Sequence, residues 1–306
     1  MRVAVAGGTG FIGRYIAEAL MAGGHDVSVL GRSPDKVAGI ARLDGADAIR
    51  ADVTQPSSLS GKLAGFDAVV MAVQLPNYPI EQPRKDLTFD RYDRQGTENV
   101  LEEAVRSGVR RFVYLSGAGA DPASPKPWYR AKGRAEAAIR RSALDHLILR
   151  PSWAYGPEDN ALNKFAAIAR FSPVIPRFGL RAQRIQPVFV EDVAQAVSKA
   201  FQTEDAWGRA LEIGGPHVMS MSEVIKVMCD VMDKKRWVLP VPIPLAKLGT
   251  APLTLLPTPP MSPGGVEFAA QDGVVDTTEL EAVLDIQPMS FREGLARYLT
   301  PKGPRH

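Results

Sequence analysis

A glycine-rich turn near the N-terminus constrains the fold of this chain more than any other feature. The turn reads Gly7-Gly8-Thr9-Gly10-Phe11-Ile12-Gly13 and joins the apolar run Val3–Ala6 to a helix-length segment, Phe11–Gly23. Glycines at positions 7, 10 and 13 permit a tight turn, close approach of the backbone to a pyrophosphate, and close packing of the helix on the strand. The helix then presents free N–H groups and the positive end of its dipole to phosphates. The order of strand, turn and helix therefore predicts a dinucleotide-binding site.

A basic residue follows the second predicted strand, where NAD-binding proteins carry an acid. An acid about 20 residues after the glycine turn accepts hydrogen bonds from the adenosine ribose of NAD. This chain instead has Leu30-Gly31-Arg32-Ser33, with Lys36 close behind. The planar guanidinium of Arg32 suits a ribose 2′-phosphate. The sequence thus favours NADP(H) over NAD(H), and the alternative is that Arg32 is a solvated loop residue.

Short apolar runs alternate with amphipathic, helix-length segments through the first half of the chain. The runs are rich in Val, Ile and Leu, as in strands that helices cover on both faces. Strands are predicted at Val3–Ala6, Asp26–Leu30, Ala48–Ala51, Asp67–Val73, Arg111–Ser116 and His146–Arg150. Helices are predicted at Phe11–Gly23, Gly96–Ser107 and Tyr129–Ser142. This pattern indicates an α/β fold with a Rossmann-type doubly wound parallel sheet.

The second half of the chain has a different pattern. Helices are predicted at Ala161–Arg170 and Glu191–Gln202, and strands at Val188–Val190 and Ala210–Ile213. We expect residues 1–156 and 188–215 to form an NAD(P)-binding Rossmann domain. Residues 157–187 and 216–306 are expected to form a smaller C-terminal α/β domain that binds a substrate or a partner.

The segment from residue 238 to residue 263 is rich in proline, and Lys247 is its only charge. Proline lacks a backbone donor and clashes with the preceding helical turn, so the segment cannot be one continuous helix. One interpretation is a packed lid or substrate-domain segment. The other is a patch that contacts a partner or a membrane interface, because the charge is unusually low.

Charge and residue usage exclude several classes of protein. The chain has 37 basic and 34 acidic residues, scattered without the basic stripe that nucleic-acid binding requires. Its four histidines have no metal-ligand spacing, so no metal site is expected. The single cysteine, Cys229, lies in an apolar helix-like run and fits a buried thiol in a reducing cytoplasm.

The sequence also bears on location. No apolar run reaches the roughly 18 residues of a membrane-spanning helix. Met1-Arg2 leads directly into the first predicted strand, which leaves no room for a signal peptide. We therefore expect a cytoplasmic protein that contacts a membrane peripherally at most.

Several motifs together resemble one enzyme family. They are Ala6–Gly13, Asp52-Val53, Gly96–Val100, Arg150–Pro157 and Gly214–Pro216. Over nearly the whole chain they resemble the extended or atypical short-chain dehydrogenase/reductases, the NAD-dependent epimerase/dehydratase superfamily. The stretch Gln186–Ala194 and the proline-rich segment most resemble the branch with the NADPH-binding accessory subunit of mitochondrial complex I and its bacterial relatives.

Catalytic members of this superfamily carry a Tyr-x-x-x-Lys pair on one helix, and here the pair is incomplete. The lysine lowers the tyrosine pKa so that the phenol can exchange a proton with the substrate. Lys132 is present, but Trp128 stands four residues earlier, and indole is neither acid nor base near neutral pH. Tyr129 lies one helical step away from the expected position, and its alternatives are a catalytic role or a structural or substrate-contact role.

The family's serine position is also altered. The catalytic Ser would fall nearer Gly117 or Ala118 than Ser116, which we expect beside the cofactor. Lys132 and Tyr129 are thus the catalytic candidates. We expect the cofactor to be bound by Gly7, Thr9, Gly10, Phe11, Ile12, Gly13, Arg32, Ser33, Lys36, Asp52, Val53, Ala72, Ser116, Lys132 and Pro151.

Two hypotheses about function follow. The first is an NADP(H)-binding protein with impaired or absent Tyr-Lys-Ser catalysis, which uses the nucleotide structurally or as a redox sensor in a respiratory or quinone-handling assembly. The second is an active NAD(P)-dependent reductase, epimerase or dehydratase on a small carbonyl or sugar-nucleotide substrate. In the second case Tyr129, Tyr155 or water would donate the proton.

Overall fold

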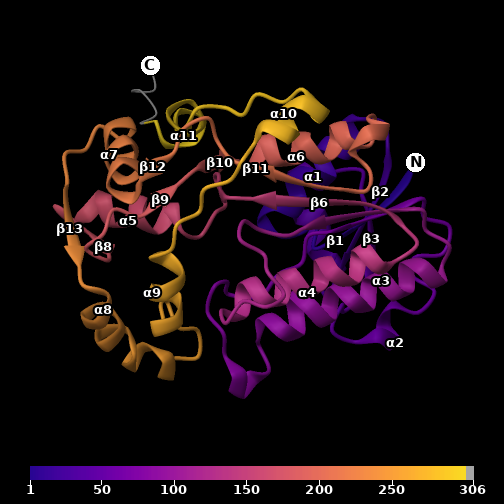
Figure 1. Cartoon of the computed structure of the whole chain (residues 1–306), viewed down its shortest axis with the longest axis horizontal. Helices are drawn as coiled ribbons and strands as arrows, with labels where there is room; N and C mark the ends of the chain where they lie inside the picture. The colour runs from indigo at the N-terminus through magenta and orange to yellow at the C-terminus, as the bar shows by residue number, and fades with distance from the viewer. Residues whose placement is uncertain (301–306) are drawn as a thin grey trace.

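The computed structural model describes residues 1–300 and contains a seven-stranded parallel sheet (Figure 1). The strands lie in the order β11-β6-β5-β4-β1-β2-β3. Their bounds are β1 (Arg2–Ala6), β2 (Asp26–Gly31), β3 (Asp47–Arg50), β4 (Ala68–Met71), β5 (Arg111–Leu115), β6 (Asp145–Pro151) and β11 (Arg209–Ile213). The predicted Rossmann-type sheet is confirmed, and each of these strands begins and ends within two residues of its predicted bounds.

Helices cover both faces of this sheet, and Figure 1 shows the two layers. The helices α1 (Phe11–Ala22) and α6 (Val190–Ala200) pack on one face, and α3 (Gly96–Arg106) and α4 (Pro127–Arg141) pack on the other. The strands between the layers are apolar on both sides; all four side chains of 3–6, for example, are fully buried. This burial explains why the predicted strands show continuous apolar runs rather than alternation.

The direction of winding reverses at β1. The chain passes from β1 to β2 and β3 on one side of the sheet, and then returns to place β4, β5 and β6 on the other side. At such a reversal the loops after neighbouring strands diverge and leave a crevice at the carboxyl ends of the strands. The glycine turn follows β1 directly and therefore lies at this crevice.

The helices beside the crevice start differently from the prediction. Helix α4 begins at Pro127, two residues before the predicted start, because the fixed φ of proline suits the first helical position. Trp128 and Tyr129 therefore both lie in its first turn. Helix α3 continues N-terminally into a π-helical turn, Asp90–Gln95, which the sequence did not predict.

A smaller part of the molecule is built from short elements. It contains α5 (Leu162–Phe171), β8 (Val174–Phe178), β9 (Arg184–Ile185), β12 (Met219–Ser220), α7 (Met221–Val231), β13 (Trp237–Val241), α8 (Ile243–Thr250) and α9 (Pro263–Ala269). Strand β8 pairs with β13, and β9 with β12. A further pair joins β7 (Trp153–Tyr155) to β10 (Pro187–Phe189). The division of the chain into two domains stays a prediction.

The last two helices return toward the large sheet. Helix α10 (Thr278–Leu284) contacts β11 and α6, and α11 (Phe291–Leu299) contacts α7 and β10. The proline-rich segment is not a continuous helix, as predicted, because it divides into β13, α8, a 3-10 turn at Pro252–Leu255 and the start of α9. Cys229 is buried on α7, and burial raises the pKa of its thiol.

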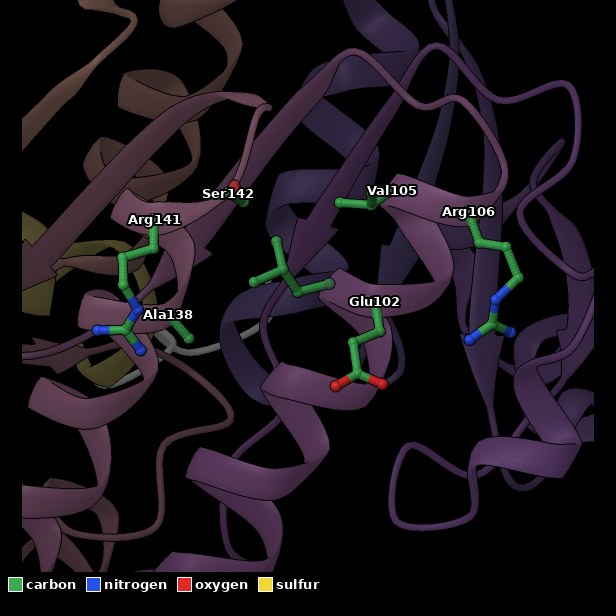
Figure 2. A pocket seen from close by; sticks show the side chains of 7 residues that line it. Glu102, Val105, Arg106, Ala138, Arg141 and Ser142 are labelled. Atoms are coloured by element: carbon green, nitrogen blue, oxygen red, sulfur yellow. The ribbon is translucent and has the colours of Figure 1, made fainter.

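A surface groove between α3 and α4 lies away from the crevice (Figure 2). Its walls are the C-terminal halves of the two helices, including Leu101, Val105 and Ala138. Helices that connect parallel strands run antiparallel to them, so these ends lie where the strands begin, opposite the glycine turn. Within residues 1–300, no helix combines the length and the apolar character needed to span a bilayer.

Candidate functional site

The glycine turn leaves no room for side chains at two positions. Gly7 has a φ of 84°, and a Cβ atom there would lie 2.9 Å from the carbonyl carbon and oxygen of Ala72. A Cβ on Gly13 would lie 2.2 Å from the carbonyl oxygen of Gly7. The turn therefore packs directly against the loop after β4 and against helix α1. This is the backbone cradle that a pyrophosphate needs, so the residues present fit a dinucleotide.

The N-terminus of α1 has no side chain to satisfy its first N–H groups. Gly10 is the N-cap, no acid lies in the first turn, and Phe11 and Ile12 are the first helical residues. Arg14, which the sequence analysis missed, folds back and donates to the carbonyl oxygens of Thr9 at 2.8 Å and Gly10 at 3.1 Å. These two hydrogen bonds connect the helix to the turn, and the first N–H groups of the helix keep no side-chain partner, as anion binding there requires. The only sequence signal of Arg14 is a cation one turn into an apolar helix.

The end of β2 gathers positive charge. Arg32 is exposed, with its guanidinium carbon 5.9 Å from the centre of the Tyr92 ring. Ser33 precedes the 3-10 helix Pro34–Gly39, which carries the exposed Lys36. Arg50, at the end of β3, donates to the Arg32 carbonyl oxygen at 3.4 Å. Arg32 and Lys36 thus lie at the strand end where a dinucleotide's adenosine ribose is held, and Arg50 beside them is paired with Asp35 at 3.7 Å.

The turn after β3 is held by local and long-range hydrogen bonds. The Asp52 carboxylate accepts from the Thr54 N–H at 2.9 Å and from the Thr54 hydroxyl at 2.8 Å. Val53 is buried, and its carbonyl oxygen accepts from Asn99 on α3 at 2.8 Å. These bonds fix the path of the backbone beside the crevice, and contact of Asp52 or Val53 with an adenine ring stays a prediction.

The ammonium of Lys132 is already paired. Its Nζ lies 3.1 Å from Oδ1 of Asp93, which is fully buried in the π-helical turn, and it also donates to the Leu115 carbonyl oxygen at 3.3 Å. Burial raises the pKa of Asp93, while the Lys132 ammonium and the Leu75 N–H oppose that rise. A buried pair of this kind neutralises both charges. The sequence analysis missed Asp93, because nothing in its local pattern indicates burial.

Ser116 belongs to a second buried network. Its hydroxyl donates to Oε1 of Glu136 at 2.6 Å, and Arg150 donates to both oxygens of Glu136, at 2.9 and 2.6 Å. The carbonyl oxygen of Pro151 accepts from the Ala118 N–H at 3.0 Å. The structure thus brings Ser116, Lys132 and Pro151 to the ends of β5 and β6, with the polar side chains of Ser116 and Lys132 engaged by carboxylates.

Trp128 lies in an aromatic cluster, which we define as Tyr78, Phe89, Trp128 and Phe268. Its ring centre is 6.1 Å from that of Phe89 and 5.4 Å from that of Phe268, both edge-on. Tyr78 packs on the same two phenylalanines, at 5.7 and 5.1 Å. Phe268 comes from α9, so the smaller part of the molecule closes the cluster. Trp128 is thereby buried on the same face of α4 as Lys132.

Tyr129 is partly buried beside Gly119, where a Cβ would lie 2.9 Å from its ring. Burial raises the pKa of Tyr129, and the Lys126 ammonium lies 5.7 Å from its ring centre. Tyr155, the other candidate proton donor, is fully buried, and its hydroxyl donates to the Phe291 carbonyl oxygen at 3.3 Å. Burial also raises the pKa of Tyr155, so neither phenol is prepared to lose a proton.

Comparison with known proteins agrees with the geometry of the crevice. A family model described as NAD(P)H-binding matches residues 7–204, which include the glycine turn, Arg32 and Lys132. This chain belongs to that NAD(P)H-binding family. The predicted NAD(P) binding and the resemblance to extended short-chain dehydrogenase/reductases are therefore confirmed.

Two curated relatives of this chain are named for different roles. Mitochondrial NADH dehydrogenase (ubiquinone) 1 alpha subcomplex subunit 9 of Arabidopsis thaliana is 28% identical over 254 residues, which are 81% of this chain and 62% of the relative. The ceramide reductase of Caulobacter vibrioides is 29% identical over 192 residues, or 63% of this chain and 58% of that protein. This chain therefore spans less than two thirds of the length of either relative.

A solved structure supports the fold. The UDP-glucuronic acid 4-epimerase from Bacillus cereus, solved with UDP-glucuronic acid and NAD, aligns with a TM-score of 0.75 over 98% of both chains at 17% identity. Such low identity shows the shared architecture alone. The epimerase/dehydratase-like fold that the motifs predict is thus confirmed.

Proposed function

We propose that this protein binds NADP(H) at the crevice and does not use the Tyr-Lys-Ser chemistry of its enzymatic relatives. The observation that carries the proposal is the pairing of Lys132 with the buried carboxylate of Asp93 at 3.1 Å. Asp93 and the Leu115 carbonyl oxygen occupy two of the three donors of Lys132, and the Asp93 carboxylate offsets the positive charge that would lower the pKa of a tyrosine. Bound dinucleotide supplies a reducible nicotinamide, and this chain's own residues would bind and orient it.

Preference for NADP(H) over NAD(H) rests on the charge at the end of β2. Arg32 and Lys36 are exposed there, and Arg32 has no carboxylate within ion-pair distance among residues 1–300. A guanidinium binds a phosphate dianion more tightly than a ribose hydroxyl. The 2′-phosphate of NADP(H) would therefore be the group that Arg32 recognises.

The partner we propose is a respiratory or quinone-handling assembly, where the bound nucleotide acts structurally or as a redox sensor. The support is the similarity to a subunit of mitochondrial NADH dehydrogenase (ubiquinone). A cytoplasmic location stays a prediction, because that relative is mitochondrial. Co-migration of the tagged full chain with a respiratory complex on native gels would support this partner, and migration only as the free protein would contradict it.

The second candidate function is an active reductase on a carbonyl substrate, and the relative named ceramide reductase favours it. A direct test mixes the protein, saturated with NADPH, with a panel of ketones, sphingoid ketones and UDP-sugars. We expect tight NADPH binding by fluorescence titration and oxidation of NADPH no faster than without protein. Sustained oxidation above that background would contradict the proposal and support the reductase.

A further inference from the structure

The smaller part of the molecule carries all of the most exposed large apolar side chains. Among residues 1–300, six such side chains are at least 60% exposed. We define these six as the apolar edge: Phe171, Leu180, Trp237, Leu245, Leu248 and Leu255. Phe171 is 90% exposed, Leu255 81% and Trp237 80%. Scattered exposed apolar residues are ordinary on a soluble protein, but their concentration in one part indicates a contact surface.

The six side chains come from neighbouring elements. Trp237 lies opposite Val174 in the β8–β13 pair, and its N–H donates to the Pro173 carbonyl oxygen at 2.9 Å, beside the turn after Phe171. A Cβ on Gly179 would lie 3.8 Å from Ile243, which places Leu180 near the start of α8. Figure 1 shows β8, β13 and α8 following one another along the left side of the molecule.

Helix α8 is short and largely apolar, and it exposes two leucines. Leu245 and Leu248 are three residues apart, so they share one face of the helix. Ala246 is buried, and α8 packs against α9. The one charge in residues 238–263, Lys247, is paired with Glu267 at 2.9 Å. Leu245 and Leu248 are thus exposed on a helix whose one charged side chain, Lys247, is neutralised by Glu267.

Basic residues flank the apolar edge at the tryptophan end. Lys234, Lys235 and Arg236 directly precede Trp237, and Arg170 precedes Phe171. None of these four cations forms an ion pair within the part of the chain that the structure describes, and Asp233 is the one acid among 232–238. Exposed leucines and a tryptophan beside unpaired lysines and arginines are typical of a surface that enters the headgroup region of a bilayer.

We propose that the apolar edge inserts into the surface of a bilayer that contains anionic phospholipids. Trp237 lies at the level of the headgroups, and the exposed Lys234 and Lys235 contact lipid phosphates. Arg236 is half-buried and donates to the Ala169 carbonyl oxygen at 2.7 Å, so it adds positive charge nearby without a direct contact. A bilayer accepts side chains from several short elements without needing a complementary shape, whereas a protein partner would have to match each of them. The proposal is independent of whether bound dinucleotide reacts.

Vesicle flotation tests the proposal with the full chain. The vesicles contain phosphatidylcholine alone or phosphatidylcholine with phosphatidylglycerol. We expect wild-type protein to bind the anionic vesicles about tenfold more tightly than the neutral ones, because several cations lie near the surface. The triple variant Trp237→Ser/Leu248→Ser/Leu255→Ser should lose at least about tenfold in binding. The control Val105→Ser/Val218→Ser removes exposed apolar groups elsewhere and should bind like wild type.

Circular dichroism and urea denaturation check that each variant is folded, and a protein that floats without binding NADPH would contradict only the proposed function. If the triple variant does not fold, the intrinsic fluorescence of wild type gives a second test. Vesicles should shift the Trp237 emission to the blue and brominated lipids should quench it, and Trp237→Phe should remove both effects. No binding to anionic vesicles would overturn the proposal. So would a wild-type dimer in sedimentation that the triple variant converts to monomer.

Discussion

The dinucleotide crevice and the Lys132 site, which we define as Asp93, Trp128, Lys132 and Phe268, lie at the carboxyl edge of the same sheet, but they are formed by different kinds of groups. The crevice consists of backbone and absent side chains, as at Gly7 and Gly13, within one stretch of sequence. The Lys132 site consists of side chains from distant segments: Asp93 pairs with the Lys132 ammonium, and the Phe268 ring packs against Trp128. Binding of a cofactor and use of that cofactor can therefore be tested separately in this fold.

The two regions also differ in how their polar groups are satisfied. The first N–H groups of α1 have no side-chain partner, so they are available to a phosphate. In contrast, Lys132 pairs with Asp93 and Ser116 donates to Glu136. An anion can enter the first region without breaking a bond inside the protein. A substrate that takes the place of Asp93 on the Lys132 ammonium would break a buried ion pair, which is energetically costly.

The largest expected effect is on stability, and it comes from removing the cation of the Lys132 site. Lys132→Met would leave the Asp93 carboxylate buried without its cation, and we expect a loss of about 3–5 kcal/mol in the free energy of unfolding. Urea denaturation measures this loss, with the exposed Lys62→Met as the control. Adding Asp93→Leu should restore most of the stability. A loss no larger than that of the control would show that the ion pair does not form.

This destabilisation should depend on pH. Burial raises the pKa of Asp93 in the wild type, and removal of Lys132 would raise it further above the value in the unfolded chain. A carboxyl whose folded pKa is raised binds its proton more tightly when folded, so the folded state loses stability as pH rises. The deficit of Lys132→Met should therefore grow as the pH rises from about 4, the pKa of an aspartate in the unfolded chain, toward neutrality. A deficit that is constant over this interval would argue against Asp93 as its source.

A single added methyl group should distort the glycine turn and weaken dinucleotide binding. Gly13→Ala would place a Cβ 2.2 Å from the Gly7 carbonyl oxygen and force the turn away from α1. We expect NADPH affinity to fall at least about 100-fold, or about 2.7 kcal/mol, in fluorescence titration. Gly249→Ala is the matched control, because a Cβ there meets nothing within 4 Å. Equal affinity in the two variants would contradict the assignment of the cradle.

A smaller effect sharpens the assignment of the cofactor. Arg32→Ala removes the guanidinium beside Tyr92 and should weaken NADPH about tenfold while leaving NADH almost unchanged, since only NADPH carries the 2′-phosphate. The readout is the ratio of the two dissociation constants. Arg110→Ala, an exposed arginine at the other end of the sheet, serves as the control. An unchanged ratio would mean that Arg32 is only a solvated loop residue.

The smallest expected effect is on catalysis. Trp128→Tyr restores the tyrosine of the family pattern, yet Lys132 would still be held by Asp93, so we expect no NADPH oxidation above background. Steady-state absorbance with the carbonyl panel measures this. Turnover by the wild type that disappears in Tyr129→Phe would contradict this expectation, because the Lys132 site would then be catalytic with Tyr129 as its proton donor.

Much of the fold could be predicted because its signals are local. Strand β1 and the glycine turn are adjacent in sequence, and the apolar runs of β4 and β5 indicate strands that helices cover on both faces. The start of α4 and the π-helical turn at Asp90–Gln95 could not be predicted as well, because helix ends depend on packing as much as on propensity. Arg14 was missed for a similar reason, since its bonds to the turn depend on side-chain direction.

By itself, the sequence determined that this chain forms a doubly wound sheet of the NAD(P)H-binding kind, and it predicted the first turn as the place where the dinucleotide binds. Both follow from periodicity and from residues within a few positions of each other. Only the tertiary structure decided that Lys132 meets Asp93, 39 residues earlier, and that Phe268 from α9 covers Trp128. The physical reason is that contacts between distant side chains do not constrain the residues next to them in sequence. A turn without room for Cβ atoms, in contrast, requires glycine at those positions.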